Sequence, residues 1–92
     1  MNILSQNEKT LLNYNNVSSV FICKNSCDYS NITWEIRAIC PYKTSDISCT
    51  LAAFEKEQDC LLVFEKIINL IDEAKVNTIK INDIIQSITS EK

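Results

Sequence analysis

The sequence EQDCLLVFEKIINLIDEAK, residues 57–75, is the only long segment of this chain whose apolar residues recur at helical spacing. With a rotation of about 100° per residue, its apolar side chains gather on about half of the helix circumference. They are Cys60, Leu61, Val63, Phe64, Ile67, Ile68, Leu70, Ile71 and Ala74. The segment therefore predicts an amphipathic helix that covers a sheet and leaves an edge for another partner.

Strands are predicted in the part of the chain that precedes this helix. Residues 32–40, ITWEIRAIC, show the clearest alternation, because Trp34, Ile36 and Ala38 alternate with mostly polar neighbours. Such a strand buries one face and leaves the other mostly in water. A further strand is predicted over residues 47–54. Its residues expected to share one face are Ile47, Cys49, Leu51 and Ala53.

The N-terminal segments add strands to this sheet. Residues 2–4 and 10–14 flank the polar SQNEK and predict a hairpin. Asn15 and Asn16 predict a tight hairpin turn, because asparagine tolerates the left-handed conformation. The strand that follows, residues 17–23, carries apolar residues on both faces, which is typical of a central strand or one covered on both sides. Together these segments predict an antiparallel β-meander of about four strands.

The residues after the long helix predict one short strand and one short helix. TIKI, residues 78–81, alternates like a strand, and DIIQSI, residues 83–88, has a helical apolar stripe. Asn82 or Asp83 is expected to cap this helix. Because the tail is apolar, we expect it to dock on the meander or on a second copy of the protein.

The predicted fold class is α+β, with a single domain over residues 1–92. An antiparallel β-meander of about four strands is packed by one long amphipathic helix, with a short C-terminal strand and helix. The residues expected on the inner face of the sheet are Trp34, Ile36, Ala38, Cys49 and Leu51. The helix residues expected to face them are Phe64, Ile67, Ile68 and Ile71.

Length and charge exclude several classes of function. A chain of 92 residues buries only roughly 60–65% of the surface that it exposes when unfolded, so oligomerisation is a common way to stabilise it. The net charge is −3 and no basic run occurs, which argues against direct binding of nucleic acid. No apolar run approaches the roughly 20 residues that cross a bilayer, and no leader pattern is present. We therefore expect a cytoplasmic protein without a membrane partner.

The cysteines and the missing histidine bear on chemistry. Five cysteines, an odd number without an export signal, indicate reduced thiols. Only Cys23 and Cys27 form a loose pair, so we expect thiols that fill a core rather than a zinc site. The absence of histidine removes the commonest general base. We expect no catalytic residue, no metal and no cofactor.

The order of segments resembles that of a group of small proteins. ILSQNEKTLLNYNNVSSVFI is followed by WEIRAI, a strand, an acidic turn and the helix CLLVFEKIINLIDEAK. This order, over most of residues 2–75, resembles small proteins that phages and mobile elements of low-GC Gram-positive bacteria carry. Its layout is similar to that of the Thoeris anti-defence proteins, which sequester cyclic ADP-ribose-type signals. The resemblance implies a small, oligomeric, non-catalytic binder.

The first functional hypothesis is sequestration of a host immune messenger, a cyclic nucleotide or cyclic ADP-ribose-type molecule. Its phosphates need donors, and Arg37 is the only arginine, on the polar face of the strand 32–40. Lys24 and Lys43 flank the neighbouring loops, where Tyr29 and Tyr42 are candidates for stacking on a base. Symmetry between two chains would bring both copies of Arg37 together.

Each hypothesis has a plainer alternative. Arg37 on a strand face is more often a solvated cation paired with Glu35 or another acid. A second functional hypothesis is an anti-CRISPR-type inhibitor that binds a host effector protein through an acidic surface. The residues of that surface are Glu55, Glu57, Asp59, Glu65, Asp72 and Glu73. The same charges are also what any solvated helix face shows.

Overall fold

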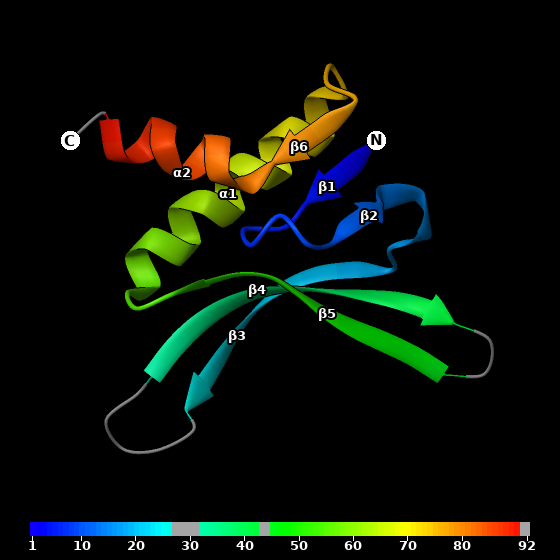
Figure 1. Ribbon diagram of the computed structural model, residues 1–92, viewed down its shortest axis with the longest axis horizontal. Coiled ribbons are helices and arrows are strands. Elements are labelled where there is room, and N and C mark those ends of the chain that lie inside the picture. The colour runs from blue at the N-terminus through cyan, green and yellow to red at the C-terminus, as the bar shows by residue number, and fades with distance from the viewer. Residues whose placement is uncertain (27–31, 43–44, 91–92) are drawn as a thin grey trace.

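The computed structural model describes residues 1–26, 32–42 and 45–90 (Figure 1). Their elements are β1 (Asn2–Leu4), β2 (Leu11–Asn13), the 3-10 turn η1 (Tyr14–Asn16), β3 (Ser19–Ser26), β4 (Ile32–Tyr42), β5 (Ser45–Phe54), α1 (Glu57–Glu73), β6 (Thr78–Lys80) and α2 (Ile81–Ser90). The predicted α+β class is confirmed. Within the described ranges, no helix is long and apolar enough to cross a membrane.

The strands form two sheets, so the predicted meander of about four strands is only partly observed: β3, β4 and β5 form an antiparallel meander, and the N-terminal strands belong to a second sheet. One sheet has the order β2-β1-β6 and the other has the order β3-β4-β5. The hairpin of β1 and β2 is confirmed, but β1 also pairs in parallel with β6, with Ile3 opposite Ile79. Both side chains are buried. Strands this short need a third strand and an apolar face to be stable, and β6 supplies both.

The predicted tight turn at Asn15 and Asn16 is also wrong, because β2 and β3 belong to different sheets. These two asparagines lie in η1, whose first residue is Tyr14. The side-chain oxygen of Asn13 accepts a hydrogen bond of 3.0 Å from the Asn15 N–H and caps the turn. η1 therefore redirects the chain from the small sheet to the large one.

Helix α1 packs on one face of the β3-β4-β5 sheet. Cys60, Val63 and Ile67 are buried, which confirms the amphipathic pattern, but Leu61, predicted on the same apolar half, is 48% exposed. Ile68, predicted to face the sheet, is 40% exposed. The reason is that the buried stripe centres on the first three residues, and Ile68 lies about 100° beyond Ile67 at its margin. The helix ends at Ala74, which adopts the left-handed conformation with φ 52.

A β-bulge interrupts the pairing of β4 with β5. Ile36 pairs with Ala52, whereas the next residue, Arg37, pairs with Thr50. Leu51 is the extra residue on β5. A bulge bends the strand and increases its twist. Arg37 therefore lies where the sheet changes direction.

The bulge changes which residues of β5 face the core. Leu51 and Ala52 are both buried, although they are consecutive, and Ala53 is exposed. The predicted grouping of Ala53 with Leu51 is therefore wrong. Strict alternation holds on either side of a bulge but not across it.

The C-terminal segment docks within the same chain. The prediction that Asn82 or Asp83 caps α2 is wrong, because the helix begins at Ile81 and both lie in its first turn. The Asn82 amide instead donates hydrogen bonds of 2.8 Å to the Gln6 carbonyl and 3.2 Å to Glu8 Oε1. These bonds hold α2 against the loop that follows β1. The tail was predicted to dock on the meander or on a second copy of the protein, and in this structure it docks on β1 and α1 of its own chain.

Candidate functional site

One face of the β3-β4-β5 sheet is not covered by any of the described helices or strands. Figure 1 shows both helices and the small sheet on one side of it, and both ends of the sheet bend away from them. We name the opposite side the outer face. Its residues are Ser19, Phe21, Cys23, Asn25, Thr33, Glu35, Arg37, Ile39, Ser48, Thr50 and Ala53. The prediction that residues 17–23 form a central strand, or one covered on both sides, is therefore wrong, because β3 lies at the edge of the sheet and shows one face to solvent.

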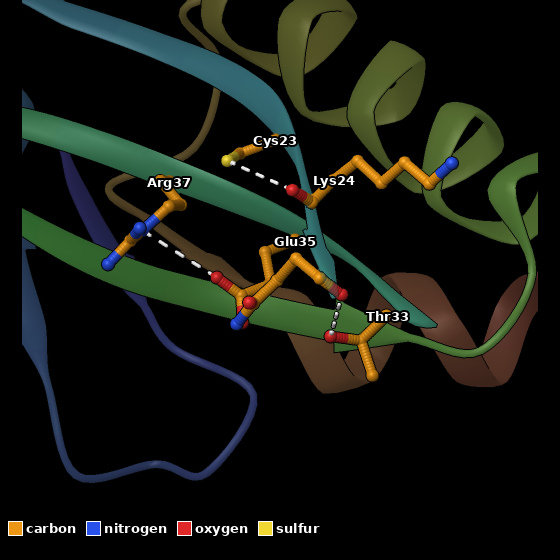
Figure 2. A network of polar contacts seen from close by, with 6 residues as sticks. Cys23, Lys24, Thr33, Glu35 and Arg37 are labelled. Carbon is orange, nitrogen blue, oxygen red and sulfur yellow. Dashed lines mark hydrogen bonds and ion pairs between the residues drawn. The ribbon is translucent and has the colours of Figure 1, made fainter. Parts of the chain in front are cut away.

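Arg37 lies in the middle of the outer face. It stands opposite Phe21 on β3 and Thr50 on β5. Its side chain is 34% exposed, and its Nε lies 3.7 Å from Glu35 Oε1 (Figure 2). This Nε is shielded from solvent and has no hydrogen-bond partner among the described residues. A guanidinium has five N–H donors, so Arg37 can donate to an anion on this face.

Glu35 is held in place beside Arg37. Its side chain is only 12% exposed. The Asn25 amide donates a hydrogen bond of 3.1 Å to Glu35 Oε2, and Thr33 Oγ1 lies 3.5 Å from the Asn25 carbonyl to which it donates (Figure 2). The pairing of Arg37 with Glu35 that the sequence favoured is thus observed. Because the arginine is partly exposed, the pair contributes at most about 1 kcal/mol to stability.

Lys24, the second predicted ligand-binding cation, lies on the other side of the sheet. It pairs with Trp34, which shares a face with the buried Ile36. Its Nζ lies 5.5 Å from the centroid of the Trp34 ring, within the range of a cation–π contact. Figure 2 shows Lys24 extending toward the helix side and Arg37 pointing away from it. The sheet therefore separates the two cations.

The other predicted ligand-binding residues lie outside the described part of the chain. This holds for Tyr29 and Lys43, and for the side chain of Tyr42, whose backbone ends β4. The site residue that sequence reasoning missed is Phe21. The alternation in residues 17–23 placed Phe21 and Cys23 on one face, but only the register of β3 with β4 places that face beside Arg37.

A groove lies on the opposite side of the sheet. It has a volume of about 750 Å³, and residues 11–13 and 15–18 form one wall. Cys40, Pro41, Ile47 and Cys49 form the other wall. We name the two-stranded end of β4 and β5, residues 40–42 and 45–49, the arm. We name the groove the arm groove.

Two thiols meet in the arm groove. Burial raises the pKa of Cys40, and the neighbouring Cys49 raises it further through its charge and a side-chain hydrogen bond. A raised pKa keeps a thiol protonated and lowers its reactivity. In the described ranges, no group of three or more His, Cys, Asp or Glu side chains is arranged to hold a metal ion. The Cys40 thiol is therefore part of the wall of the groove rather than a reactive group.

The chemistry of the outer face is that of a binding surface. The guanidinium of Arg37, the ring of Phe21 and the amide of Asn25 all lie on this face. The guanidinium and the amide offer hydrogen-bond donors, and the ring offers a plane for stacking. No protein-family model, curated protein or solved structure matches this chain. Its function is therefore argued from this geometry and from the sequence.

Proposed function

We propose that this chain is a non-catalytic, phage-encoded counter-defence protein that sequesters a small nucleotide messenger of the cyclic ADP-ribose type. Arg37 carries the proposal, because its buried Nε lacks a hydrogen bond among the described residues while its guanidinium reaches the uncovered outer face. The protein acts in the cytoplasm of the host and works as a homo-oligomer. Sequestration requires tight binding and no bond cleavage.

The outer face provides contacts for both parts of a nucleotide. The guanidinium of Arg37 donates charge-assisted hydrogen bonds to phosphate oxygens. Phe21, opposite it on β3, offers a ring on which a base can stack. The neighbours Ser19 and Ala53 are small, so they leave room for a ligand above the strands.

Glu35 sets the affinity of this site. Its carboxylate lies 3.7 Å from the Arg37 Nε and competes with an incoming phosphate. A Glu35→Gln substitution keeps an oxygen that can accept from Asn25 but removes the negative charge. We expect this variant to bind an anionic ligand several-fold more tightly, because the like charges of carboxylate and phosphate repel.

Isothermal titration calorimetry with cyclic ADP-ribose as the probe tests the proposal. Arg37→Gln is expected to weaken binding roughly 10- to 100-fold, the usual effect of losing a hydrogen bond to a charged group. Lys24→Gln is the matched control, because it removes the same charge from the other side of the sheet and should leave the affinity unchanged. Absence of heat with the wild-type chain, or equal losses in both variants, would overturn the outer face as a site for this messenger.

Native mass spectrometry tests sequestration without a chosen ligand. The purified chain is incubated with lysate from cells whose nucleotide-signalling immunity has been triggered. The expected result is an oligomer that retains a small molecule, which is released on denaturation. Arg37→Gln should retain less of it than Lys24→Gln does. An unchanged mass for the wild-type chain would contradict the proposal.

A second candidate function is inhibition of a host effector protein, and the solvent side of α1 favours it. Leu61, Leu62 and Ile68 are exposed there. Glu65 and Asp72 lie on the same stripe. An acidic and apolar helix face suits a protein partner with a basic groove, as an anti-CRISPR-type inhibitor would use. If the Leu61→Lys variant no longer captured a host effector protein while the Arg37→Gln variant still did, this function would be favoured over the first.

A further inference from the structure

The arm groove has no charged residue among its described lining residues. The chain as a whole carries a net charge of −3, so two copies repel each other weakly at long range. At the arm groove they can approach without burying a charge. Uncharged, partly apolar surface of this kind is typical of the centre of an interface between copies of one chain.

The two walls of the arm groove present apolar side chains to solvent. Leu11 on β2 is 59% exposed and Ile47 on β5 is 44% exposed. They lie on opposite walls of the groove. A second molecule that enters the groove would cover both.

The arm itself lacks a third strand. The pairing of β3 with β4 reaches Ser19 and Ile39 and goes no further along β4 in the described residues. Gln6 covers the edge of β5 only at Leu51 and Ala53, through hydrogen bonds of 2.8 and 2.9 Å. A two-stranded hairpin is only marginally stable by itself, and its free edges favour pairing with another chain.

The chain exposes more surface than a compact monomer of its mass. The chain exposes 6331 Å², whereas a monomer of its mass of 10.5 kDa exposes roughly 5,400 Å². The excess of roughly 900 Å² is close to the roughly 800 Å² that each partner buries in a standard interface. The radius of gyration of 13.4 Å likewise exceeds the roughly 12 Å expected for this length.

From these observations we infer that the arm groove is a self-association surface, on which a second copy of this chain docks to form a homodimer. The interface covers Leu11 and Ile47 and gives the arm the packing that it lacks within one chain. It leaves the outer face with Arg37 open in both copies. The inference does not depend on the ligand proposed for that face.

Sedimentation velocity of the full chain, with reductant present, tests the dimer. Between roughly 1 and 100 µM, the wild-type chain is expected to shift from monomer to dimer. Ile47→Glu and Leu11→Glu should remain monomeric throughout, because each buries a charge in the interface. Leu62→Glu, a matched control at an exposed position of α1, should dimerise like the wild type. A wild-type monomer at every concentration, or dissociation by Leu62→Glu alone, would overturn the inference.

Hydrogen exchange provides a readout that needs no variant. Amides of residues 45–49 are expected to exchange at least several-fold more slowly at high than at low protein concentration. Amides of β3 at residues 23–25, at the end of the strand that lies away from the groove, should show no such change. Equal rates for residues 45–49 at both concentrations would contradict a dimer through the arm.

Discussion

The two faces of the β3-β4-β5 sheet differ in what they do, although the same strands build both. On β4, Ile36 and Ala38 point toward α1 and are fully buried, whereas Glu35 and Arg37 point to the outer face. The inner face supplies the apolar burial that stabilises the fold. The outer face keeps its polar groups accessible. A strand of alternating residues can therefore serve stability and recognition at once, and substitutions on the two faces should have separable effects.

The largest difference is expected between two isoleucines of β4. Ile36→Ala should lower the free energy of unfolding by roughly 2–5 kcal/mol, because it leaves a cavity in the core. Ile39→Ala removes the same atoms from the half-buried outer face and should cost about 1 kcal/mol or less. Urea denaturation of both variants measures the contrast. Equal losses would mean that the outer face is as tightly packed as the inner one.

A second contrast concerns pH and the buried thiol of Cys60. Burial, and then the charge of Glu57, raises the pKa of Cys60 to about 11. The folded chain therefore holds this proton more tightly than the unfolded chain, in which the thiol titrates at its ordinary pKa of 9.0. The resulting stability is fully present below that pH and is lost as pH rises toward 11, by roughly 2–3 kcal/mol.

Urea denaturation between pH 8 and pH 11 measures this loss. Cys60→Ala should be less stable at pH 8 but should show a flatter decline with pH. Cys23→Ala, on the outer face, should decline as the wild type does, because Cys60 is still present. If the free energy of unfolding declined equally with pH in all three proteins, Cys60 would be excluded as the source of the decline.

The bulge provides a third contrast, between two consecutive alanines of β5. Ala52 is buried and Ala53 is exposed. Ala52→Leu should overpack the core and cost roughly 1–3 kcal/mol. Ala53→Leu should change stability by less than about 0.5 kcal/mol. The opposite order in thermal unfolding would mean that the strand alternates without a bulge.

The smallest expected effect is the coupling between Glu35 and Arg37. A double-mutant cycle with Glu35→Gln and Arg37→Gln should give at most about 1 kcal/mol, and less at high salt. The same substitutions are expected to change ligand affinity much more than stability. A coupling of several kcal/mol would show that the pair supports the fold rather than leaving Arg37 free for a ligand.

Local patterns predicted the elements of this fold well. The apolar stripe of α1, the alternation of β4 and the short strand β6 all follow from the spacing of residues within each segment. Such patterns report which face of an element is buried. They do not report which element covers that face. The division into two sheets was missed for this reason, because it depends on the pairing of Ile3 with Ile79.

The candidate site depended on the same missing information. Arg37 was identified as the single arginine on a polar strand face, but its neighbours were not. Phe21 comes beside it through the register of β3 with β4, and the bend beneath it comes from the extra residue Leu51. No glycine marks this bulge, since the chain contains none. Lys24 was predicted to bind the same ligand as Arg37. Side chains alternate along β3, however, so Lys24 lies on the opposite side of the sheet.

The parallel pairing of β1 with β6 has a consequence for synthesis on the ribosome. β1 is translated before one of its two neighbours, because Thr78–Lys80 follow it roughly 75 residues later. At about 5–20 residues per second, the nascent chain carries an unpaired β1 edge and an uncovered Ile3 for roughly 4–15 s. The large sheet and α1 can assemble in that interval. The small sheet is completed only after β6 has been translated. A chain stalled before residue 78 therefore exposes an unpaired, aggregation-prone strand edge to chaperones and proteases.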